Sequence, residues 1–335
     1  TGSMIFIALS APWFWLVSAR NPEFARFFFI HEHVERFLTT VHRREAPFWY
    51  FLPVLFVGFL PWTSFLPRII GDGLRREAGQ TFQTGRFLLV WAIFVLAFFS
   101  KSSSKLPSYI LPMFPALALL LGQTLAKARA ASLKKHLVLP LCLWGLAALA
   151  YPLSGFLATA QWTPWPAYQQ FAAFLSIGGI LFVLSAMLAW RALSRNQVPL
   201  AAMMLCAGGL FGALCAAQGH DAIGRLKSSK DVVAQISAHL RPETELFSVR
   251  AYEQTFPFYL RRPVTLVEYQ DEFSFGQRVE PDKSIASLEA FVARWKTAPH
   301  AMALMEENTF KLLSQRGLAM KPVYQDLRRM IVVKP

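Results

Sequence analysis

The sequence has few charged residues. Asp, Glu, Lys and Arg make up 16% of its 335 residues, whereas a typical soluble domain contains about 25%. Hydrophobic residues reach 54% and aromatic residues 14%. This composition excludes a compact water-soluble enzyme and is typical of a membrane protein.

The charged residues are unevenly distributed. Residues 1–217 contain 23 of them and residues 218–335 contain 31, which predicts a transmembrane part followed by a soluble part. Acidic residues are especially scarce in the first part, which has 6 acidic and 17 basic residues. Basic residues of membrane proteins occupy cytoplasmic loops or bind anionic lipids and phosphates. The positive charge therefore does not indicate nucleic-acid binding.

Cysteine is also scarce. Cys142, Cys206 and Cys215 lie in apolar runs without the spacing of a redox or metal motif, so we interpret them as packing residues. Residues 218–335 lack a glycine-rich phosphate loop, a zinc-ligand pattern and a nucleophile elbow. This part is therefore interpreted as a folded cap in preference to a catalytic domain.

Long hydrophobic runs are abundant. Seven of them are candidate membrane spans, because about 20 apolar residues cross a bilayer, although one run is shorter than this. The runs are 4–18, 48–70, 87–100, 107–126, 136–159, 171–190 and 199–217.

The connections between these runs differ in charge. Three short, basic connections alternate with the others, and the positive-inside rule assigns them to the cytoplasm. They are residues 71–86, 127–135 and 191–198. The remaining connections are then extracytoplasmic, namely residues 19–47, 101–106, 160–170 and the tail from 218. In 160–170, Trp162, Trp165 and Tyr168 are expected to anchor the chain at the membrane interface.

The tail alternates predicted helices with predicted strands. Helical spacing occurs over 229–240, with Ser228 or Ser229 as a cap, and over 284–295. Buried strands are expected at the apolar runs 246–252, 265–269, 301–305 and 330–335. This alternation predicts a small α/β domain.

Two outer loops carry candidate chemistry. Residues 21–37 predict an amphipathic helix in the membrane interface, with Phe27, Phe28, Ile30, Val34 and Phe37 toward lipid and Glu32, His33 and Arg36 elsewhere. A neutral histidine there could bind a zinc-like divalent metal while a neighbouring arginine holds a phosphate. His31 and Glu35 are neighbours on the same helix. The alternative is a membrane elbow with incidental polar residues.

The second loop places Lys101 and Lys105 between two spans, followed by Pro107, Tyr109 and Pro112. Each proline removes a backbone donor and disturbs regular helix, and irregular backbone at membrane depth is tolerated where it lines a cavity. The two lysines could neutralise a lipid phosphate. The alternative is that their side chains extend from helix ends toward water.

These loops carry a family resemblance. The strings FFIHEHVERF, APFWYFLPVLFVGFLPW and SKLPSYILPMFPALALLLG occur in this order. The chain thereby resembles the distal half of the bacterial lipid-carrier-dependent glycosyltransferases of family 39, which include lipid A aminoarabinose transferases and relatives of protein O-mannosyltransferases. The resemblance implies the GT-C architecture, a polytopic α-helical membrane part followed by an extracytoplasmic α/β domain.

The resemblance also implies roles for individual residues. Glu32, His33, Arg36 and Phe37 match the family's E-H-x-x-R-F motif, in which the histidine is associated with a divalent metal and the arginine lies near the donor phosphate. Lys105, Tyr109 and Pro112 match the K-L-P-x-Y-x-x-P motif, whose lysine and tyrosine border the polyprenyl phosphate. His31 has no secure counterpart.

The implied activity is transfer of a sugar from a polyprenyl-phosphate donor to an extracytoplasmic acceptor such as lipid A or another glycan, at the bacterial inner membrane and without a nucleotide cofactor. In the family, the catalytic carboxylate lies in a first outer loop that this sequence does not contain. The sequence therefore resembles a carboxy-terminal fragment, which we do not expect to catalyse alone. A lipid or sugar transporter and a non-catalytic scaffold are the alternatives. Transporters tend to contain internal repeats, and none is evident here.

Overall fold

The computed structural model describes residues 2–35, 46–76, 78–157, 165–270 and 273–335, apart from the side chains of residues 32, 34 and 35. Its internal contacts divide the chain into two compact units. The helical unit comprises Thr1–Tyr151 and Leu175–Ala216, and the α/β unit comprises Pro152–Phe174 and Ala217–Pro335. Each is described separately below.

The prediction of about seven membrane spans is confirmed at the level of helix length and composition. Within the described residues, five helical segments are long and apolar enough to cross a membrane, and the number rises to seven if each of two bent helix pairs is one span. The apolar run 87–100, short in the sequence, belongs to a helix of 18 residues. The segments are α1 (Gly2–Arg20), α5 (Thr84–Lys101), η4 (Pro107–Met113) with α6 (Phe114–Ala126), α10 (Trp165–Ser194) and α11 (Val198–Lys227).

The two bent pairs were each predicted as one continuous run. In the first, α3 (Phe51–Gly58) and α4 (Leu66–Leu74) meet at 115°. In the second, α7 (Ala130–His136) and α8 (Val138–Ala148) are followed by α9 (Ala150–Leu157) at 60°. The hydrophobicity of the sequence does not reveal such bends, because a broken helix and a straight helix can contain the same continuous run of apolar residues.

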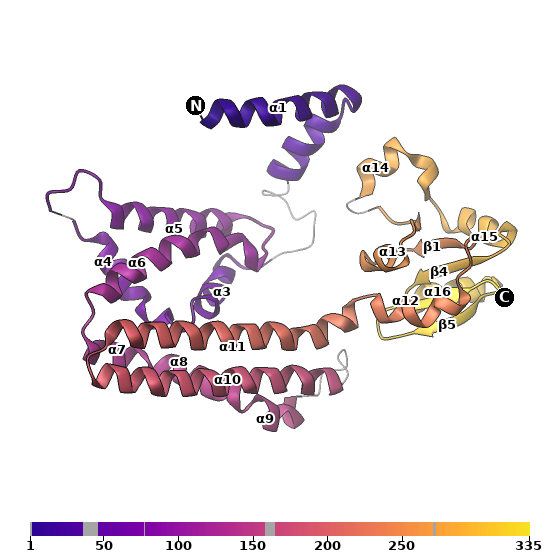
Figure 1. Ribbon diagram of the computed structural model, residues 1–335. Helices are drawn as coiled ribbons and strands as arrows, with labels where there is room; N and C mark the ends of the chain where they lie inside the picture. The colour runs from indigo at the N-terminus through magenta and orange to yellow at the C-terminus, as the bar shows by residue number, and fades with distance from the viewer. Residues whose placement is uncertain (1, 36–45, 77, 158–164, 271–272) are drawn as a thin grey trace. The chain divides into compact units, whose positions relative to one another are not determined.

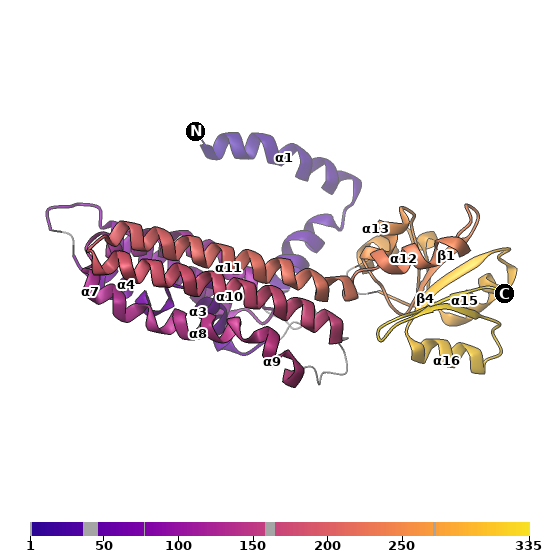
Figure 2. The same cartoon turned by 60° about the horizontal axis from the view of Figure 1, so that its bottom comes forward.

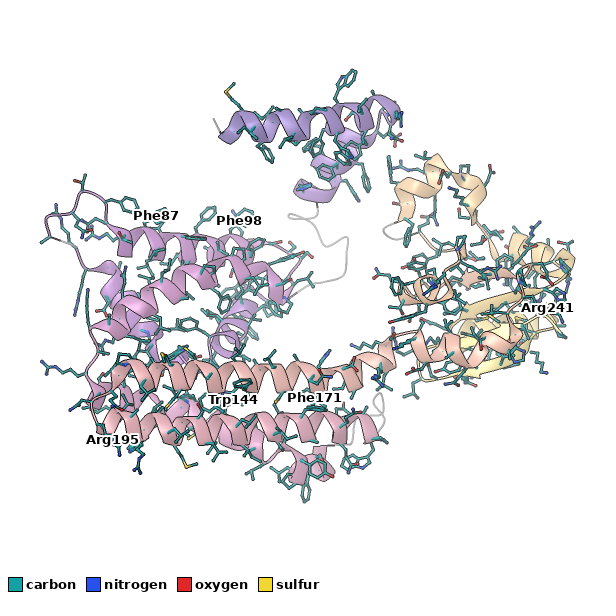
Figure 3. The ribbon with its side chains drawn as sticks, viewed as in Figure 1. Phe87, Phe98, Trp144, Phe171, Arg195 and Arg241 are labelled. Atoms are coloured by element: carbon teal, nitrogen blue, oxygen red, sulfur yellow. The ribbon has the colours of Figure 1, made fainter. Side chains whose placement is uncertain are left out.

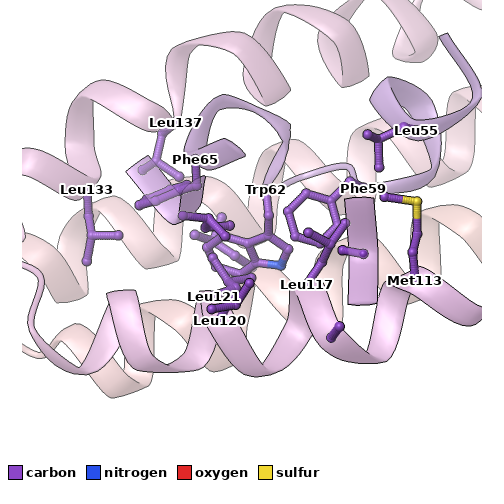
Figure 4. Packing of buried hydrophobic residues seen from close by; sticks show 14 of the residues in the cluster. Leu55, Phe59, Trp62, Phe65, Met113, Leu117, Leu120, Leu121, Leu133 and Leu137 are labelled. Carbon is purple, nitrogen blue, oxygen red and sulfur yellow. The ribbon is translucent and has the colours of Figure 1, made fainter. Parts of the chain in front are cut away.

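The helical unit is held together by large apolar side chains and by close helix contacts. Phe59, Trp62 and Phe65 at the first bend pack with leucines of α6 and α7 (Figure 4). A Cβ added at Gly212 of α11 would lie 2.6 Å from the Trp144 ring of α8, and one at Gly179 of α10 would lie 2.4 Å from a backbone nitrogen of α8 (Figure 3). Small residues permit such close approach of helices within membranes.

The three basic connections gather at one end of the helical unit. The Thr124 hydroxyl, near the end of α6, donates to Asp72 near the end of α4 at 3.1 Å. Lys134 in α7 donates to Ser194 at the end of α10 at 3.0 Å. Because α5 begins at this end and finishes at Lys101, the connection 101–106 lies at the other end (Figure 1).

The predicted small α/β domain is confirmed. Its six-stranded sheet has the order β3-β2-β1-β4-β6-β5. β1, β2, β3 and β4 are parallel, and β6 is antiparallel to both β4 and β5. The strands are β1 (Glu245–Val249), β2 (Thr265–Val267), β3 (Ser284–Ile285), β4 (Ala301–Met305), β5 (Lys321–Gln325) and β6 (Met330–Val333).

Helices cover both faces of this sheet (Figure 2). α15 (Leu288–Thr297) and α16 (Glu307–Gln315) bury one face, and α12 (Lys230–Ile236) and α13 (Thr255–Leu260) bury the other. Alternation along β4 produces this division, since Ala303 packs on the first face and Leu304 on the second. All five residues of β4 are buried, as expected for a central strand.

Some boundaries differ from the predictions. The predicted helix 284–295 begins as the short strand β3, and the helix starts only after Ser287, whose hydroxyl accepts from the Ala290 amide at 3.2 Å. The predicted strand 246–252 ends at Val249, because Arg250 adopts a left-handed conformation with φ 54°. Strand β5 and helices α13, α16 and α14 (Ser274–Val279) were not predicted.

Candidate functional site

The first candidate loop contains a helix of the π type. η1 spans Arg26–Glu35, so its hydrogen bonds join residues five apart. The Nδ1–H of His33 donates to the Phe28 carbonyl at 2.6 Å. The Phe28 ring lies beside Phe14 of α1 at 5.5 Å and beside the His33 ring at 4.8 Å, and its lipid-facing role stays a prediction.

Only part of the predicted E-H-x-x-R-F site can be placed. Arg36 and Phe37 lie outside the described residues, as do the side chains of Glu32 and Glu35. His33 is exposed, and the bond from its Nδ1 leaves Nε2 as the nitrogen that could bind a ligand. Trp162 of the predicted aromatic anchor also lies outside the described residues, whereas Trp165 and Tyr168 lie on α10.

His33 does not form a metal site with its described neighbours. Among the residues whose side chains the structure describes, no three His, Cys, Asp or Glu side chains gather closely enough to hold an ion. A structural zinc ion needs four ligands and a catalytic one needs three. A carbonyl that fixes the histidine tautomer is a common neighbour of metal-binding histidines, so His33 is suited to be one ligand of a larger set.

The second candidate loop separates two lysines of very different exposure. Lys101 is the last residue of α5 and is exposed. Lys105 is only 7% exposed. Its ammonium group donates to the carbonyl of Ser102 and has no other polar partner within the described part of the chain. A phosphate-neutralising role was predicted for both lysines, but their environments differ: Lys101 is exposed and Lys105 is buried.

The positive charge of Lys105 is not balanced by a negative charge on any described residue nearby. Removing an ammonium group from water costs several kcal/mol, and a neutral carbonyl offsets only part of this cost. No carboxylate lies within ion-pair distance of Lys105 in the described residues. A buried positive charge that no described carboxylate balances favours binding of an anion.

Two serines, Ser102 and Ser104, lie close to Lys105 in the same loop. The Ser102 hydroxyl donates to the Ser104 carbonyl at 3.0 Å, which closes a tight turn. Ser104 is 5% exposed, and its own hydroxyl has no hydrogen-bond partner in the described structure. Buried polar atoms are nearly always paired, so the Ser104 hydroxyl is a second buried donor without a partner among the described residues.

The prolines act as predicted. Residues 107–113 form the 3₁₀ helix η4 before regular α-helix starts at Phe114. Pro112 lacks the amide that an α-helix needs at this position. Tyr109 lies within η4, half-buried, with its ring 5.2 Å from that of Phe99 on α5. The loop geometry therefore places Lys105 and Tyr109 on the same short, irregular connection.

The structure places Lys105 and Tyr109 on one connection, with Lys101 exposed at the end of the preceding helix. No hydrogen bond or ion pair between described atoms joins these residues to His33. Sequence reasoning did not identify Ser102 and Ser104. The signal was present, since three consecutive serines between two lysines supply hydroxyl and backbone donors. Its meaning depends on burial, which a local pattern does not reveal.

These features define a class of protein: a multi-pass helical membrane protein with an α/β domain and, at one helix end, a buried lysine whose sole polar partner among the described residues is a carbonyl. A scan against protein-family models matches residues 232–334 to the aminoarabinose transferase C-terminal domain. Among solved structures, ArnT from Cupriavidus metallidurans bound to undecaprenyl phosphate is 35% identical with a TM-score of 0.86, over 99% of this chain.

Curated sequences agree. An undecaprenyl phosphate-alpha-4-amino-4-deoxy-L-arabinose arabinosyl transferase of Pseudomonas fluorescens is 42% identical over 45% of this chain, and one of Erwinia tasmaniensis is 35% identical over 55%. The resemblance predicted from the sequence, to an ArnT-like protein of the GT-C type, is confirmed. The chain spans 60% of the Cupriavidus structure and 28% and 32% of the two curated relatives.

Proposed function

We propose that this chain supplies the carrier-phosphate site of a glycosyltransferase, which moves a sugar from a polyprenyl-phosphate donor to an acceptor such as lipid A or another glycan. The observation that carries the proposal is the buried Lys105 ammonium, whose only polar partner among the described residues is a carbonyl. The names of the relatives support undecaprenyl phosphate as the carrier.

The chemistry of the reaction requires a cation at this place. An acceptor oxygen attacks the anomeric carbon, and the bond from that carbon to the carrier phosphate breaks. A hydroxyl acceptor gives its proton to a base that we do not assign to this chain, whereas a phosphate acceptor has no proton to lose. The phosphate then changes from a diester with one negative charge to a monoester with up to two. A fixed cation therefore binds the leaving group more strongly than the donor, which lowers the barrier.

Individual residues take distinct parts in this scheme. Lys105 stabilises the charge that develops on the leaving phosphate, Ser104 donates from its unpaired hydroxyl, and Tyr109 positions the phosphate from η4. Lys101 and Arg36 contribute positive charge, and Glu32 borders the substrate. We assign no general base to this chain.

We further propose a divalent, zinc-like metal with His33 as one ligand. The support is the Nε2 of His33, which has no hydrogen bond to a described atom, and the carbonyl that orients the ring. The remaining ligands would come from residues other than the described ones. No step of the scheme above depends on this ion, and no nucleotide cofactor is required.

The proposed orientation places the phosphate site and the α/β domain on the extracytoplasmic side of the bacterial inner membrane. Its support is the gathering of the three basic connections at one helix end, which the positive-inside rule assigns to the cytoplasm. In spheroplasts of a strain with the native cysteines replaced, Ser314→Cys on α16 should react with a membrane-impermeant thiol reagent. Ser132→Cys should not react, and its labelling would reverse the proposed orientation.

Lipid binding tests the phosphate site directly. The purified chain in detergent is titrated with undecaprenyl phosphate and, separately, with undecaprenol, which lacks the phosphate. Lys105→Met keeps the length of the side chain but removes its charge. A charge-assisted contact contributes about 1.5–3 kcal/mol, so Lys105→Met should weaken undecaprenyl phosphate binding roughly ten- to a hundredfold and leave undecaprenol binding unchanged.

Lys127→Met is the matched control, because Lys127 follows α6 at the opposite helix end. It should bind both lipids as the unmodified chain does. Equal binding of undecaprenyl phosphate by Lys105→Met and Lys127→Met would remove Lys105 from the site.

A further inference from the structure

The sheet of the α/β unit has an open cleft at one edge. β1 lies between β2 and β4 and is parallel to both. The chain continues from β1 to β2 and β3 on one side and then returns to β4 on the other, so the strand order reverses between β1 and β4. Open α/β sheets bind ligands beyond the carboxyl ends of the strands at such a reversal. A cleft of about 730 Å³ lies there, lined by residues that follow β1, β2 and β4.

The turns that leave β1 and β2 have a strained backbone. Arg250 and Glu268 directly follow these strands and adopt φ angles of 54° and 48°, a region that residues other than glycine seldom occupy. Their side chains form an ion pair at 2.6 Å. Such conformations concentrate at functional sites. The two turns bring Tyr252 and Tyr269 into the lining of this cleft, with ring centroids 6.1 Å apart. We call it the carboxyl-edge cleft, because it lies beyond the carboxyl ends of β1, β2 and β4.

The opposite wall of the cleft is rigid. It is formed by the turn between β5 and β6, in which Arg329 is 3% exposed. The Arg329 guanidinium donates to Asp326 at 2.9 Å, to the Ser229 hydroxyl at 2.8 Å and to the Ser228 carbonyl at 2.7 Å. Arg328 donates to Glu253 at 2.8 Å. The wall is therefore formed before any ligand arrives, and ordering it costs no binding energy.

The charges that line the cleft do not favour an anionic ligand. Arg250, Arg328 and Arg329 are each paired with a carboxylate. Glu306, which precedes α16, has a carboxylate without a hydrogen bond or ion pair to any described residue. A phosphate would meet arginines that are already neutralised and a carboxylate that repels it.

We infer that the carboxyl-edge cleft binds a carbohydrate, a sugar unit that carries no negative charge. Sugar hydroxyls both donate and accept, so they can satisfy the Glu306 carboxylate and the side-chain amide of Asn308 in the lining. A tyrosine ring can cover the apolar C–H face of a sugar. The volume lies within the roughly 300–1,000 Å³ of small-molecule sites. An amine on the sugar strengthens binding through Glu306.

Three small probes test this inference on the full chain, purified in a detergent without a sugar headgroup. Glucosamine, glucose and glucose 6-phosphate are titrated by ligand-observed saturation-transfer NMR. Glucosamine and glucose are expected to bind with Kd values of about 1–10 mM, in that order of strength, and glucose 6-phosphate at least about fivefold more weakly than glucose.

Two substitutions assign the binding to the cleft. Glu306→Gln should weaken glucosamine about tenfold and glucose about threefold, because a charged acceptor contributes more than a neutral one. Glu289→Gln on α15, outside the lining, is the matched control and should change neither affinity. Tyr269→Ala should weaken both sugars about tenfold, whereas Tyr269→Phe, which keeps the ring, should restore most of the affinity.

The test is independent of the proposed carrier-phosphate site. Lys105→Met should bind glucosamine as the unmodified chain does, so a failure at one site leaves the other intact. The inference is overturned if neither uncharged glucose nor glucosamine binds, if glucose 6-phosphate binds most tightly, or if Glu306→Gln and Glu289→Gln bind glucosamine equally.

Discussion

Among the described residues, each unit buries one strongly basic side chain, and the two side chains differ in how they are paired. In the helical unit, Lys105 is 7% exposed and donates only to the Ser102 carbonyl among described residues. In the α/β unit, Arg329 is 3% exposed and is surrounded by a carboxylate, a hydroxyl and backbone carbonyls. A fully paired cation holds segments of the fold together, whereas an unpaired one is a site prepared for an external anion.

The partners of Arg329 explain its structural role. Asp326 lies in its own turn, but Ser228 and Ser229 lie about a hundred residues earlier, between α11 and α12. This cluster fastens the β5–β6 turn to the segment that enters the domain. Ser229 therefore does not cap α12 with its side chain; the neighbouring Ser228 hydroxyl accepts from the Lys230 amide at 3.2 Å instead.

The largest expected effect is that of removing the paired cation. Arg329→Met removes a guanidinium that donates to Asp326, to the buried Ser229 hydroxyl and to the Ser228 carbonyl, so the free energy of unfolding of the α/β unit should fall by about 3–5 kcal/mol. Hydrogen exchange of peptides covering β4 and β6 measures this loss. Arg316→Met, which removes an exposed arginine, should change the same quantity by less than about 0.5 kcal/mol. Equal protection in both variants would contradict the comparison.

Removing the unpaired cation should have the opposite sign. Lys105→Met relieves the burial of a charge that lacks an ionic partner, so the free energy of unfolding of the helical unit should stay the same or rise by about 1 kcal/mol. Thermal unfolding in detergent, without added lipid, checks this. A loss above about 2 kcal/mol would mean that Lys105 supports the fold and is not reserved for a ligand.

A smaller effect concerns pH. Burial alone would raise the pKa of Asp326, but hydrogen bonds from the Arg328 amide and from Arg329 outweigh it and hold the pKa below its ordinary value, which is about 3.9. The stabilising contribution of Asp326 is therefore complete above the unfolded pKa and is lost as the pH falls through the lower folded value.

Unfolding of the chain between pH 6 and pH 2.5 tests this dependence. The unmodified α/β unit should lose stability at the acid end, and Asp326→Asn should lose less over the same interval. Asp282→Asn, at an exposed position, should follow the unmodified chain. Identical slopes for Asp326→Asn and the unmodified chain would show that Asp326 does not carry the effect.

The smallest effect on stability is expected at His33, an exposed residue with one polar partner. His33→Ala should change the free energy of unfolding by less than about 0.5 kcal/mol. It should nevertheless abolish binding of about one zinc-like ion, measured by metal analysis after chelator-free purification, while His31→Ala retains most of it. An unmodified protein that contains no metal would end the proposal for His33.

Much of the architecture follows from local pattern. Apolar runs identified all seven candidate spans, and the alternation of helices and strands identified the α/β domain, because burial in lipid or in a sheet demands apolar side chains over a fixed length. The K-L-P-x-Y motif correctly placed an irregular backbone at Pro107 and Pro112. The same reasoning missed β5, whose residues are half-buried or exposed and so lack an apolar run.

The site was only partly predictable. The sequence presents Lys101 and Lys105 as equivalent, four residues apart. The structure separates them, because α5 ends at Lys101 in an exposed position whereas the turn closed by Ser102 and Ser104 carries Lys105 into the protein.

The sequence by itself determined that this is a multi-pass membrane chain with an α/β domain, which motifs could hold a phosphate, and to which family of proteins it is similar. These properties depend on composition, periodicity and short spacings. Only the tertiary structure decided which cation is buried with no counter-charge on a described residue, which cation is paired with groups a hundred residues away, and where the strand order reverses to open a cleft. Those properties depend on contacts between segments distant in the chain, and a local pattern carries no information about them.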